Sequence, residues 1–272
     1  MKKFRIGFVM VLLWTIFVLC LPMVNAEAKS PVLDSILKRG ELVVGVSGNQ
    51  PPLNMRTKSG TIIGLEADLA QMIADAMGVR LKLLPMNFNM LIPTLEDKGI
   101  DMIMSGMTMT PKRNLTLAFV GPYFLSGKSF LTKSQTIASL KDAAEIDSPN
   151  STVAALDGST SQLFVEKIMP HAKLIKTKTY DAAVKMVLED KIDAFIADYP
   201  ICIISVFRYP DQGLVSLITP LTYEPIGIGM PANDPHLVNW AENFLNTLEG
   251  SGQLEELRAR WFEDASWLAD LP

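Results

Sequence analysis

The chain has 272 residues, of which 49% are hydrophobic and 20% are charged. This length and apolar content allow one large core or two smaller ones, and they exclude an intrinsically disordered chain. The formal net charge is −4, and it becomes −7 without residues 1–26, which hold three basic residues and no acidic residue. Because an acidic chain is repelled by phosphate backbones, we expect no nucleic-acid partner.

Residues 1–26 have the pattern of a secretory signal peptide. A basic start precedes an apolar run at 6–24, which is broken by Pro22, and Ala26 ends a small-residue cleavage site. We therefore predict that residues 1–26 direct the chain to the periplasm and are then removed.

Two other interpretations of the amino terminus stay open. The apolar run at 6–24 is nearly long enough to remain as a membrane anchor. Cys20 could carry a lipid, but the bulky Leu19 stands where bacterial lipoproteins have a small residue. No later segment is apolar for long enough to cross a membrane, so we expect the rest of the chain to lie in the exported compartment.

Strands and helices alternate through the first half of the chain. Short β-branched runs alternate with stretches of helical period, which predicts strand 42–46, helix 65–76, strand 81–84, helix 91–98 and strand 100–104. This βαβ order is typical of a parallel sheet with helices on its faces.

A second series of the same kind begins at Thr152. It predicts strand 153–156, helix 159–169, strand 173–176, helix 181–188 and strand 194–197. Val43–Gly48 lines up with Val153–Gly158, and Glu96–Met104 resembles Glu189–Ile196, in the same order. The repetition favours two similar lobes, although two βαβ units can also resemble each other by chance.

We therefore predict an α/β chain with the two-lobed type II fold of periplasmic binding proteins. Lobe 1 is predicted from 27–130 and 222–272, and lobe 2 from 131–221. The chain would cross between the lobes near 130–133 and near 218–223, and two crossings make a hinge. A strand at 226–230 and a helix with its apolar face from Leu237 to Leu248 would return the chain to lobe 1.

Polar residues follow several of the predicted strands. In sheets of this kind, ligands bind beyond the carboxyl ends of strands, where helix amino termini also point. These strand-end residues come from both predicted lobes and are Ser47, Ser105, Gly106, Gly158, Ser159 and Asp198. A cleft between the lobes is therefore the expected ligand site.

The segment Ser105–Arg113 combines hydroxyls with one guanidinium. Thr110 is a candidate cap for a helix whose first residue is Pro111, and such a cap leaves backbone N–H groups beside Arg113. Arg113 could hold a carboxylate through two parallel hydrogen bonds, which a lysine cannot make. This segment predicts a carboxylate site.

Several segments resemble the family 3 extracellular solute-binding proteins, which serve polar amino-acid ABC transporters. The resemblance runs from about Asp34 to Trp261 and rests on Gly64–Leu69, Ile92–Leu95, Ser105–Arg113 and Gly121–Phe124. The Ser105–Arg113 segment is its most specific part.

The resemblance implies a role for each matching residue. Arg113 would bind the α-carboxylate of the ligand, and Asp198 would bind its α-ammonium. Phe88 would stack on the aliphatic part of the ligand. Hydroxyl and backbone contacts fall on Ser105, Gly106, Thr108, Ser159 and Thr160.

The chain departs from the family pattern at the start of lobe 1. Ser47 stands where relatives with basic ligands often carry an acid, while Gln50 and Leu53 replace common aromatics. We include Ser47 and Gln50 in the predicted ligand site, and the side-chain specificity stays open.

Each of these residues also has a simpler interpretation. Arg113 alone could form a surface salt bridge, Asp198 could cap a helix before Pro200, and Phe88 could be core. Ser159 and Thr160 could cap their own helix and do nothing else.

Other chemistry is disfavoured by spacing or context. Glu66 and Asp68 open a helix, where acids favour the dipole, so a structural role is expected. Gly121–Ser129 ends like a phosphate loop, but five residues separate its glycines instead of four. Alternating methionines at 102–109 fill core more readily than they bind copper, and Cys202 lies in an apolar run. We expect no metal or cofactor.

The leading hypothesis is the monomeric substrate-binding component of an ABC importer, whose partners are an amino-acid-like ligand and a membrane permease. Two alternatives stay open. Some relatives of this family are cyclohexadienyl dehydratases, which act on prephenate or arogenate and need a general acid in the cleft. A ligand-sensing module for a membrane receptor would carry the same binding residues.

Overall fold

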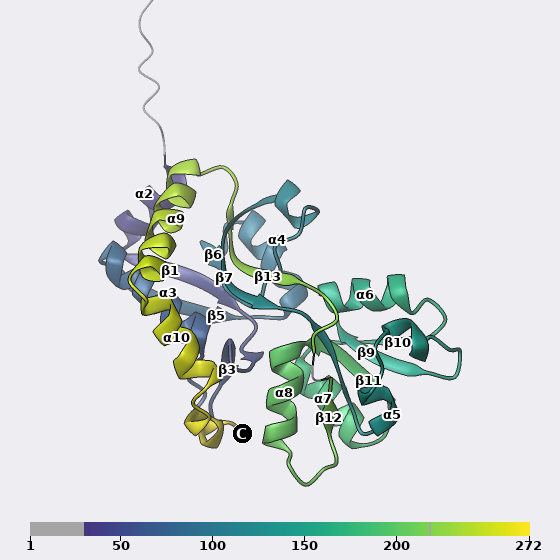
Figure 1. Cartoon of the computed structure of the whole chain (residues 1–272). Helices are drawn as coiled ribbons and strands as arrows, with labels where there is room; N and C mark the ends of the chain where they lie inside the picture. The colour runs from purple at the N-terminus through teal and green to yellow at the C-terminus, as the bar shows by residue number, and fades with distance from the viewer. Residues whose placement is uncertain (1–29, 218) are drawn as a thin grey trace, which may run out of the picture.

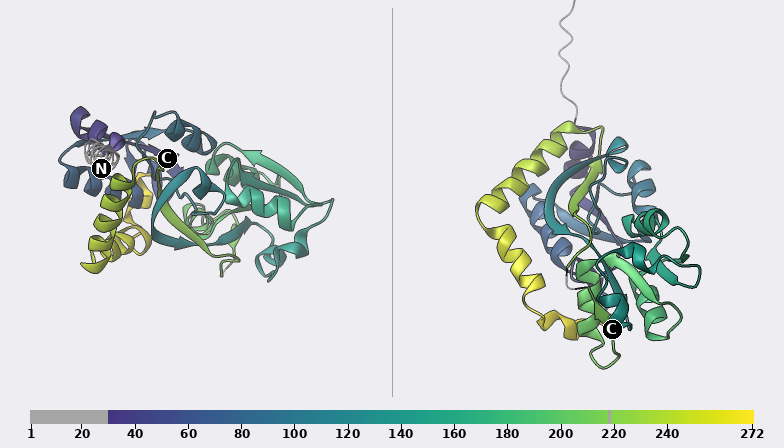
Figure 2. Two further views of the ribbon diagram at one scale, coloured as in Figure 1. Left: turned by 90° about the horizontal axis from the view of Figure 1, so that it is seen from above. Right: turned by 45° about the vertical axis from the view of Figure 1, so that its right-hand side comes forward.

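The computed structural model describes residues 30–217 and 219–272, and the predicted signal peptide lies outside them. Two five-stranded sheets, each with helices around it, form two units that lie side by side (Figure 1). We call the unit around the first sheet lobe 1 and the unit around the second sheet lobe 2. Figure 2 shows from two further sides that the lobes touch along one junction.

Lobe 1 is built on a sheet with the strand order β5-β1-β6-β13-β7. Strand β1 runs parallel to β5 and β6, whereas β13 runs antiparallel to β6 and β7. The strands are β1 (Glu41–Val46), β5 (Arg80–Pro85), β6 (Met102–Ile103), β7 (Leu117–Ser126) and β13 (Glu224–Pro231). A small antiparallel sheet contains β2 (Asn49–Gln50), β3 (Asn54–Arg56) and β4 (Ile62–Ile63).

Helices cover lobe 1 on the faces of its sheet (Figure 1). They are α2 (Pro31–Arg39), α3 (Leu65–Met77), α4 (Leu91–Glu96), α9 (Pro235–Gly250) and α10 (Gln253–Phe262). Short 3-10 turns are η1 (Phe88–Met90), η2 (Arg113–Leu115) and η4 (Ser266–Asp270). Apolar residues of α3, α9 and α10 pack with those of β1 and β13 in one core.

Lobe 2 has the strand order β10-β9-β11-β8-β12. Strands β9, β10 and β11 are parallel, and β8 is antiparallel to both β11 and β12. The strands are β8 (Lys128–Thr132), β9 (Thr152–Leu156), β10 (Lys173–Thr177), β11 (Ala194–Asp198) and β12 (Val215–Ser216). The helices are α5 (Gln135–Ala138), η3 (Ala143–Ile146), α6 (Thr160–Ile168), α7 (Tyr180–Leu188) and α8 (Tyr199–Arg208).

The predicted α/β class and βαβ order are confirmed, with two corrections. Both sheets are mixed and not parallel, because the strands that carry the chain between the lobes enter each sheet against its βαβ direction. The strand predicted at 100–104 is only Met102–Ile103, and helix α4 stops at Glu96. Lys98 ends this segment in the left-handed region, with φ of 61°.

The first crossing between the lobes lies earlier than predicted. Strand β7 ends at Ser126 in the first sheet and β8 begins at Lys128 in the second, so the chain crosses at Gly127 and not at 130–133. A Cβ on Gly127 would lie 2.1 Å from the carbonyl oxygen of Thr222, so only glycine lets the two crossing segments touch.

The second crossing lies between β12 and β13, after Ser216 and before Glu224. The predicted segment 218–223 falls in this interval, and residue 218 lies outside the described residues.

Buried side chains continue from one lobe into the other. One apolar cluster contains Phe88 and Met107 from lobe 1 together with Tyr180 and Cys202 from lobe 2. The methionines at 102, 104 and 107 are fully buried, which agrees with their core interpretation. No helix among the described residues is long and apolar enough to span a membrane.

Asp234 holds the first described helix against the last third of the chain. Its Oδ2 accepts hydrogen bonds from Val32 N (2.8 Å) and Leu33 N (3.1 Å), at the start of α2. Its Oδ1 accepts from Ser30 Oγ (2.7 Å) and from Leu237 N (3.0 Å), so it also caps α9. One buried carboxylate therefore caps two helices that lie 200 residues apart.

We predict that Asp234→Ala lowers the free energy of unfolding by about 2–3 kcal/mol at pH 7, because four donors lose their acceptor. Burial opposes ionisation of Asp234, but the N–H groups of Leu237, Leu33 and Val32 and the Ser30 hydroxyl lower its pKa below 3.8. A carboxyl with a lowered pKa stabilises the fold above its unfolded pKa, and that contribution disappears as the pH falls through its folded pKa.

The difference in the free energy of unfolding between the wild type and Asp234→Ala, measured by urea unfolding, should therefore shrink as the pH falls from about 4 through the folded pKa. The exposed neighbour Asn233 provides the control, and Asn233→Ala should change stability by less than about 0.5 kcal/mol. An equal loss in both variants, or a loss that is the same at pH 3 and pH 7, would contradict this assignment.

Candidate functional site

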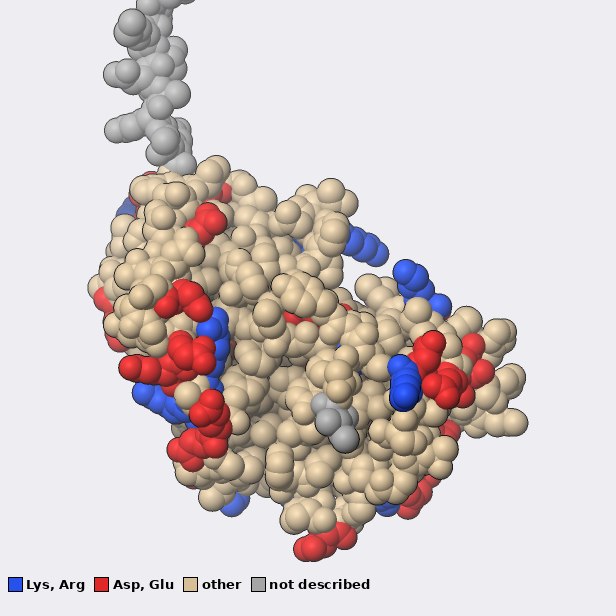
Figure 3. All heavy atoms as spheres, in the orientation of Figure 1, with Lys and Arg blue, Asp and Glu red and all other residues tan. Residues whose placement is uncertain are grey.

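The candidate site lies where the two lobes meet, at the carboxyl ends of their strands. Figure 3 shows the junction from outside, with a notch at one end and basic side chains on both of its sides. Polar contacts join the lobes here: Gln50 Nε2 to Tyr180 Oη (3.0 Å), Thr108 Oγ1 to Thr160 Oγ1 (3.3 Å), Arg113 Nη2 to Gly158 O (3.2 Å) and Asn89 Nδ2 to Asp157 Oδ2 (2.7 Å).

Arg113 begins η2, three residues after Thr110. Thr110 Oγ1 accepts a hydrogen bond from Arg113 N (3.2 Å), as predicted, but the capped segment is a single turn and not a full helix. The guanidinium lies over the ring of Phe88, with 5.6 Å from Cζ to the ring centroid, and donates to Thr108 O (2.9 Å) and Gly158 O (3.2 Å). Arg113 is therefore held by both lobes.

The charge of Arg113 is balanced from a distance. Burial lowers the pKa of this guanidinium, while the charges of Asp198 and Glu224 act in the opposite direction. Among the described residues, its direct hydrogen-bond partners are carbonyl oxygens and no carboxylate forms a salt bridge with it. A half-buried guanidinium of this kind is suited to a ligand carboxylate.

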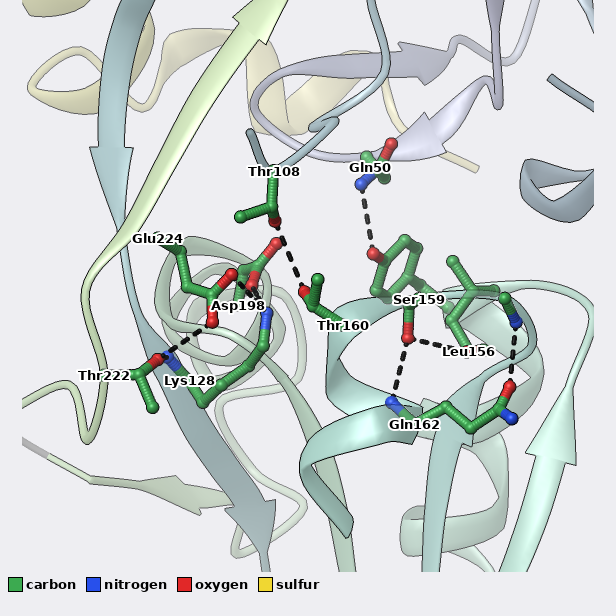
Figure 4. A network of polar contacts seen from close by, with 12 residues as sticks. Gln50, Thr108, Lys128, Leu156, Ser159, Thr160, Gln162, Asp198, Thr222 and Glu224 are labelled. Atoms are coloured by element: carbon green, nitrogen blue, oxygen red, sulfur yellow. Dashed lines mark hydrogen bonds and ion pairs between the residues drawn. The ribbon is translucent and has the colours of Figure 1, made fainter. Parts of the chain in front are cut away.

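Asp198 ends β11 in lobe 2, as predicted, and its partner is a lysine that the sequence interpretation did not select. Lys128 Nζ lies 2.5 Å from Asp198 Oδ1 and 3.5 Å from Glu224 Oε2 (Figure 4). The Lys128 side chain is 1% exposed. Lys128 is therefore a buried charge of the site, and Glu224 is a half-buried one.

Thr222 fixes these charges to the second crossing. Its Oγ1 accepts a hydrogen bond from Lys128 N (2.9 Å) and donates to Glu224 Oε1 (3.2 Å). The two crossings are thus joined at the point where the site is most charged. In the sequence, Lys128 drew attention only as part of Gly127-Lys128-Ser129, which we compared with a phosphate-binding loop and rejected because of its glycine spacing.

The predicted residues Ser47, Ser105 and Gln50 form one network in lobe 1. The hydroxyls of Ser47 (2.9 Å) and Ser105 (2.8 Å) both donate to Gln50 Oε1, and Ser105 Oγ accepts from Ser47 N (2.9 Å). Gln50 is fully buried and turns its amide nitrogen toward Tyr180 of lobe 2. The serines therefore orient Gln50, and Gln50 faces the opposite lobe.

Glu66 supports this network from helix α3. It is fully buried on α3, where its Oε1 accepts from Gly106 N (2.6 Å) and from the Tyr123 hydroxyl, and its Oε2 accepts from Asn54 Nδ2. Burial raises the pKa of Glu66, and these three hydrogen bonds act against the rise. A structural role was expected from the helix dipole, but its actual function is to hold the Ser105–Thr108 segment.

Two neighbouring hydroxyls in lobe 2 have different surroundings. Ser159 Oγ accepts from Gln162 N (3.1 Å) and donates to Leu156 O (2.6 Å), so it caps α6 (Figure 4). Thr160 instead faces Thr108 across the junction. The structure thus brings Thr160, Thr108, Arg113, Asp198 and Gln50 to the junction, whereas Ser159 is used by its own helix.

Gly106 is required by both its backbone and its neighbour. Its φ is 57°, and a Cβ there would lie 2.5 Å from Gln50 Nε2. Gly40 has a similar φ of 67°, but a Cβ there would meet nothing within 4 Å. Alanine substitutions at the two glycines therefore distinguish the cost of backbone strain alone from the cost of strain together with a steric clash.

We predict that Gly40→Ala lowers the free energy of unfolding by about 1–2 kcal/mol, from backbone strain alone. Gly106→Ala should lose about 1–3 kcal/mol more, because Gln50 must leave its buried hydrogen bonds. Urea unfolding of both variants measures the difference. Equal losses would show that Gly106 does not hold Gln50 in place.

The fold and the opposed charges at the junction are those of a two-lobed solute-binding protein. Residues 42–264 match the bacterial extracellular solute-binding proteins, family 3, and the chain belongs to that family. Its homologues include amino-acid-binding components of ABC transporters.

Two relatives show the range of the family. The chain is 24% identical over 239 residues to a cyclohexadienyl dehydratase of Pseudomonas aeruginosa, with 88% of this chain and 89% of that one covered. It is 27% identical over 226 residues to the arginine-binding extracellular protein ArtP of Bacillus subtilis, with 82% and 86% covered.

A solved structure is also similar to this chain. It is a binding component of an ABC transporter from Wolinella succinogenes in complex with lysine. The sequences are 39% identical, the alignment covers 85% of this chain and 99% of that one, and the TM-score is 0.79.

Proposed function

We propose that this protein is the periplasmic substrate-binding component of an ABC importer and captures an amino acid, or a similar small zwitterion, between its lobes. The observation that carries this proposal is the origin of the two key charges. Arg113 comes from lobe 1 and Asp198 from lobe 2, and they face the same junction. A carboxylate on one and an ammonium on the other would bridge the lobes.

Hinge closure would follow from these contacts. A zwitterion that binds Arg113 in the open state gains Asp198 and Thr160 only when lobe 2 approaches, so it favours the closed state. The crossings at Gly127 and between Ser216 and Glu224 are the segments about which the lobes would rotate.

The partner and compartment follow from the family. Bacterial extracellular solute-binding proteins act outside the cytoplasm, and we propose that residues 1–26 direct this chain to the periplasm. There the closed monomer would deliver its ligand to a membrane permease. The names of two relatives, for arginine binding and for a lysine complex, support an amino-acid ligand.

Binding without catalysis is the function that the site supports best. The similarity to a cyclohexadienyl dehydratase raises the alternative of a dehydration, which needs a proton donor in the cleft. Asp198 and Glu224 both form ion pairs with the Lys128 ammonium, so each of these carboxylates already has a cationic partner. Residues 199–201, which follow Asp198, contain no carboxyl group.

A thermal-shift screen of residues 27–272 against the common amino acids and prephenate tests this proposal. A ligand at a hundred times its Kd adds about 2.7 kcal/mol of stability, which raises Tm by about 5–10 °C. Arg113→Lys keeps the charge but loses the paired hydrogen bonds, and it should weaken binding about 10- to 100-fold in calorimetry.

The exposed residue Lys112, next to Arg113, provides the control. Lys112→Ala should bind the ligand within about twofold of the wild type. If Arg113→Lys binds the ligand as tightly as the wild type, Arg113 does not hold the ligand carboxylate through paired hydrogen bonds. The absence of any shift with every amino acid would overturn the proposed function, and steady turnover of prephenate would replace it with the dehydratase.

A further inference from the structure

We infer that the ligand is a zwitterion whose side chain is uncharged, and that Lys128 is the specificity-determining residue that excludes a second ligand cation. This inference rests on the proposed function and names the ligand class of the same site. Its basis is the charge balance at the junction.

Four charged groups lie together at the base of the site. Arg113 and Lys128 are positive, and Asp198 and Glu224 are negative, so their charges cancel. A zwitterion with an uncharged side chain keeps this balance when it binds. A ligand with one further charge leaves a buried charge without a partner, which is costly.

Lys128 cannot move away from the site. Strand β8 pairs with β11 so that Lys128 lies opposite Asp198, and Lys128 N is bound by Thr222. With the lobes together its side chain is 1% exposed, so the ammonium is screened from water. Its charge is therefore a fixed property of the site.

Glu224 allows Asp198 to serve a ligand. Because Glu224 Oε2 lies 3.5 Å from Lys128 Nζ, it can compensate the lysine while Asp198 also accepts the α-ammonium. With Arg113 on the α-carboxylate, every charge then has a partner. A second cationic group on the ligand would be repelled by Lys128, and both acids beside Lys128 would already have partners.

The other predicted ligand contacts carry no charge. Ser47, Gln50 and Phe88 line the lobe 1 side, and Tyr180 meets Gln50 from lobe 2. Buried amide and hydroxyl groups favour polar side chains that can exchange hydrogen bonds with them.

Acids elsewhere along the junction already have partners. Asp157 Oδ2 accepts from Asn89 Nδ2 at 2.7 Å, and Asp181 Oδ1 accepts from Arg208 Nη1 at 2.8 Å. Glu66 is fully buried behind Gly106, where it accepts hydrogen bonds from three groups. Each of these carboxylates is therefore engaged by groups of the protein, Asp181 by a cation and Asp157 and Glu66 by neutral donors.

Calorimetry with glutamine, serine, histidine, arginine, lysine and glutamate tests the inference on the wild type and three variants. The wild type should bind an uncharged side chain best, with arginine and lysine at least about tenfold weaker. Lys128→Met leaves one surplus acid, so the preference should move at least about tenfold toward arginine or lysine.

The double variant Lys128→Met/Glu224→Gln is neutral again and should return to the wild-type preference. Glu224→Gln alone leaves one surplus cation, so glutamate should gain at least about tenfold over the uncharged amino acids. This second direction keeps the test decisive if Lys128→Met does not fold, which circular dichroism would show.

Arginine or lysine bound by the wild type as tightly as any uncharged amino acid would overturn the inference and leave the proposed function intact. Unchanged preferences in Lys128→Met and Glu224→Gln would likewise remove the role of Lys128. The absence of binding to every amino acid would overturn both, so the two failures are distinguishable.

Discussion

The structure depends on the contact between its two crossing segments. Gly127 touches the Thr222 carbonyl so closely that no side chain fits, and this approach places Lys128 at the start of β8 beside Glu224 at the start of β13. Buried Lys128 and Asp198 and half-buried Glu224 therefore meet where the chain passes between the lobes, since Asp198 lies opposite Lys128 in the second sheet. The segment that would bend is also the segment that sets the charge of the site.

Each lobe prepares its own half of the site. In lobe 1, Glu66 holds Gly106 from behind, and the serines at 47 and 105 orient Gln50 toward lobe 2. In lobe 2, Ser159 starts α6 and leaves Thr160 facing the junction. Because most of these hydrogen bonds are satisfied inside one lobe, the lobes can separate without exposing many unpaired polar groups.

Local patterns predicted much of this architecture. The βαβ series, the family, the Ser105–Arg113 segment and the strand end at Asp198 all follow from short-range signals in the chain. Lys128 and Glu224 were missed because 96 residues separate them, and they meet only where β8 and β13 begin, at the two crossings between the lobes. The same reason explains the early crossing at Gly127, whose constraint comes from distant Thr222. Glu66 was taken for a dipole acid, since nothing near it in the chain shows that it faces Gly106.

The measurement that tests the central claim most directly is a crystal structure of residues 27–272 with the amino acid that binds most tightly. The account predicts both carboxylate oxygens of the ligand on Arg113, its ammonium on Asp198, and Lys128 still between Asp198 and Glu224. A ligand bound within one lobe only, or with its ammonium away from Asp198, would contradict the claim that opposite charges from opposite lobes capture a zwitterion.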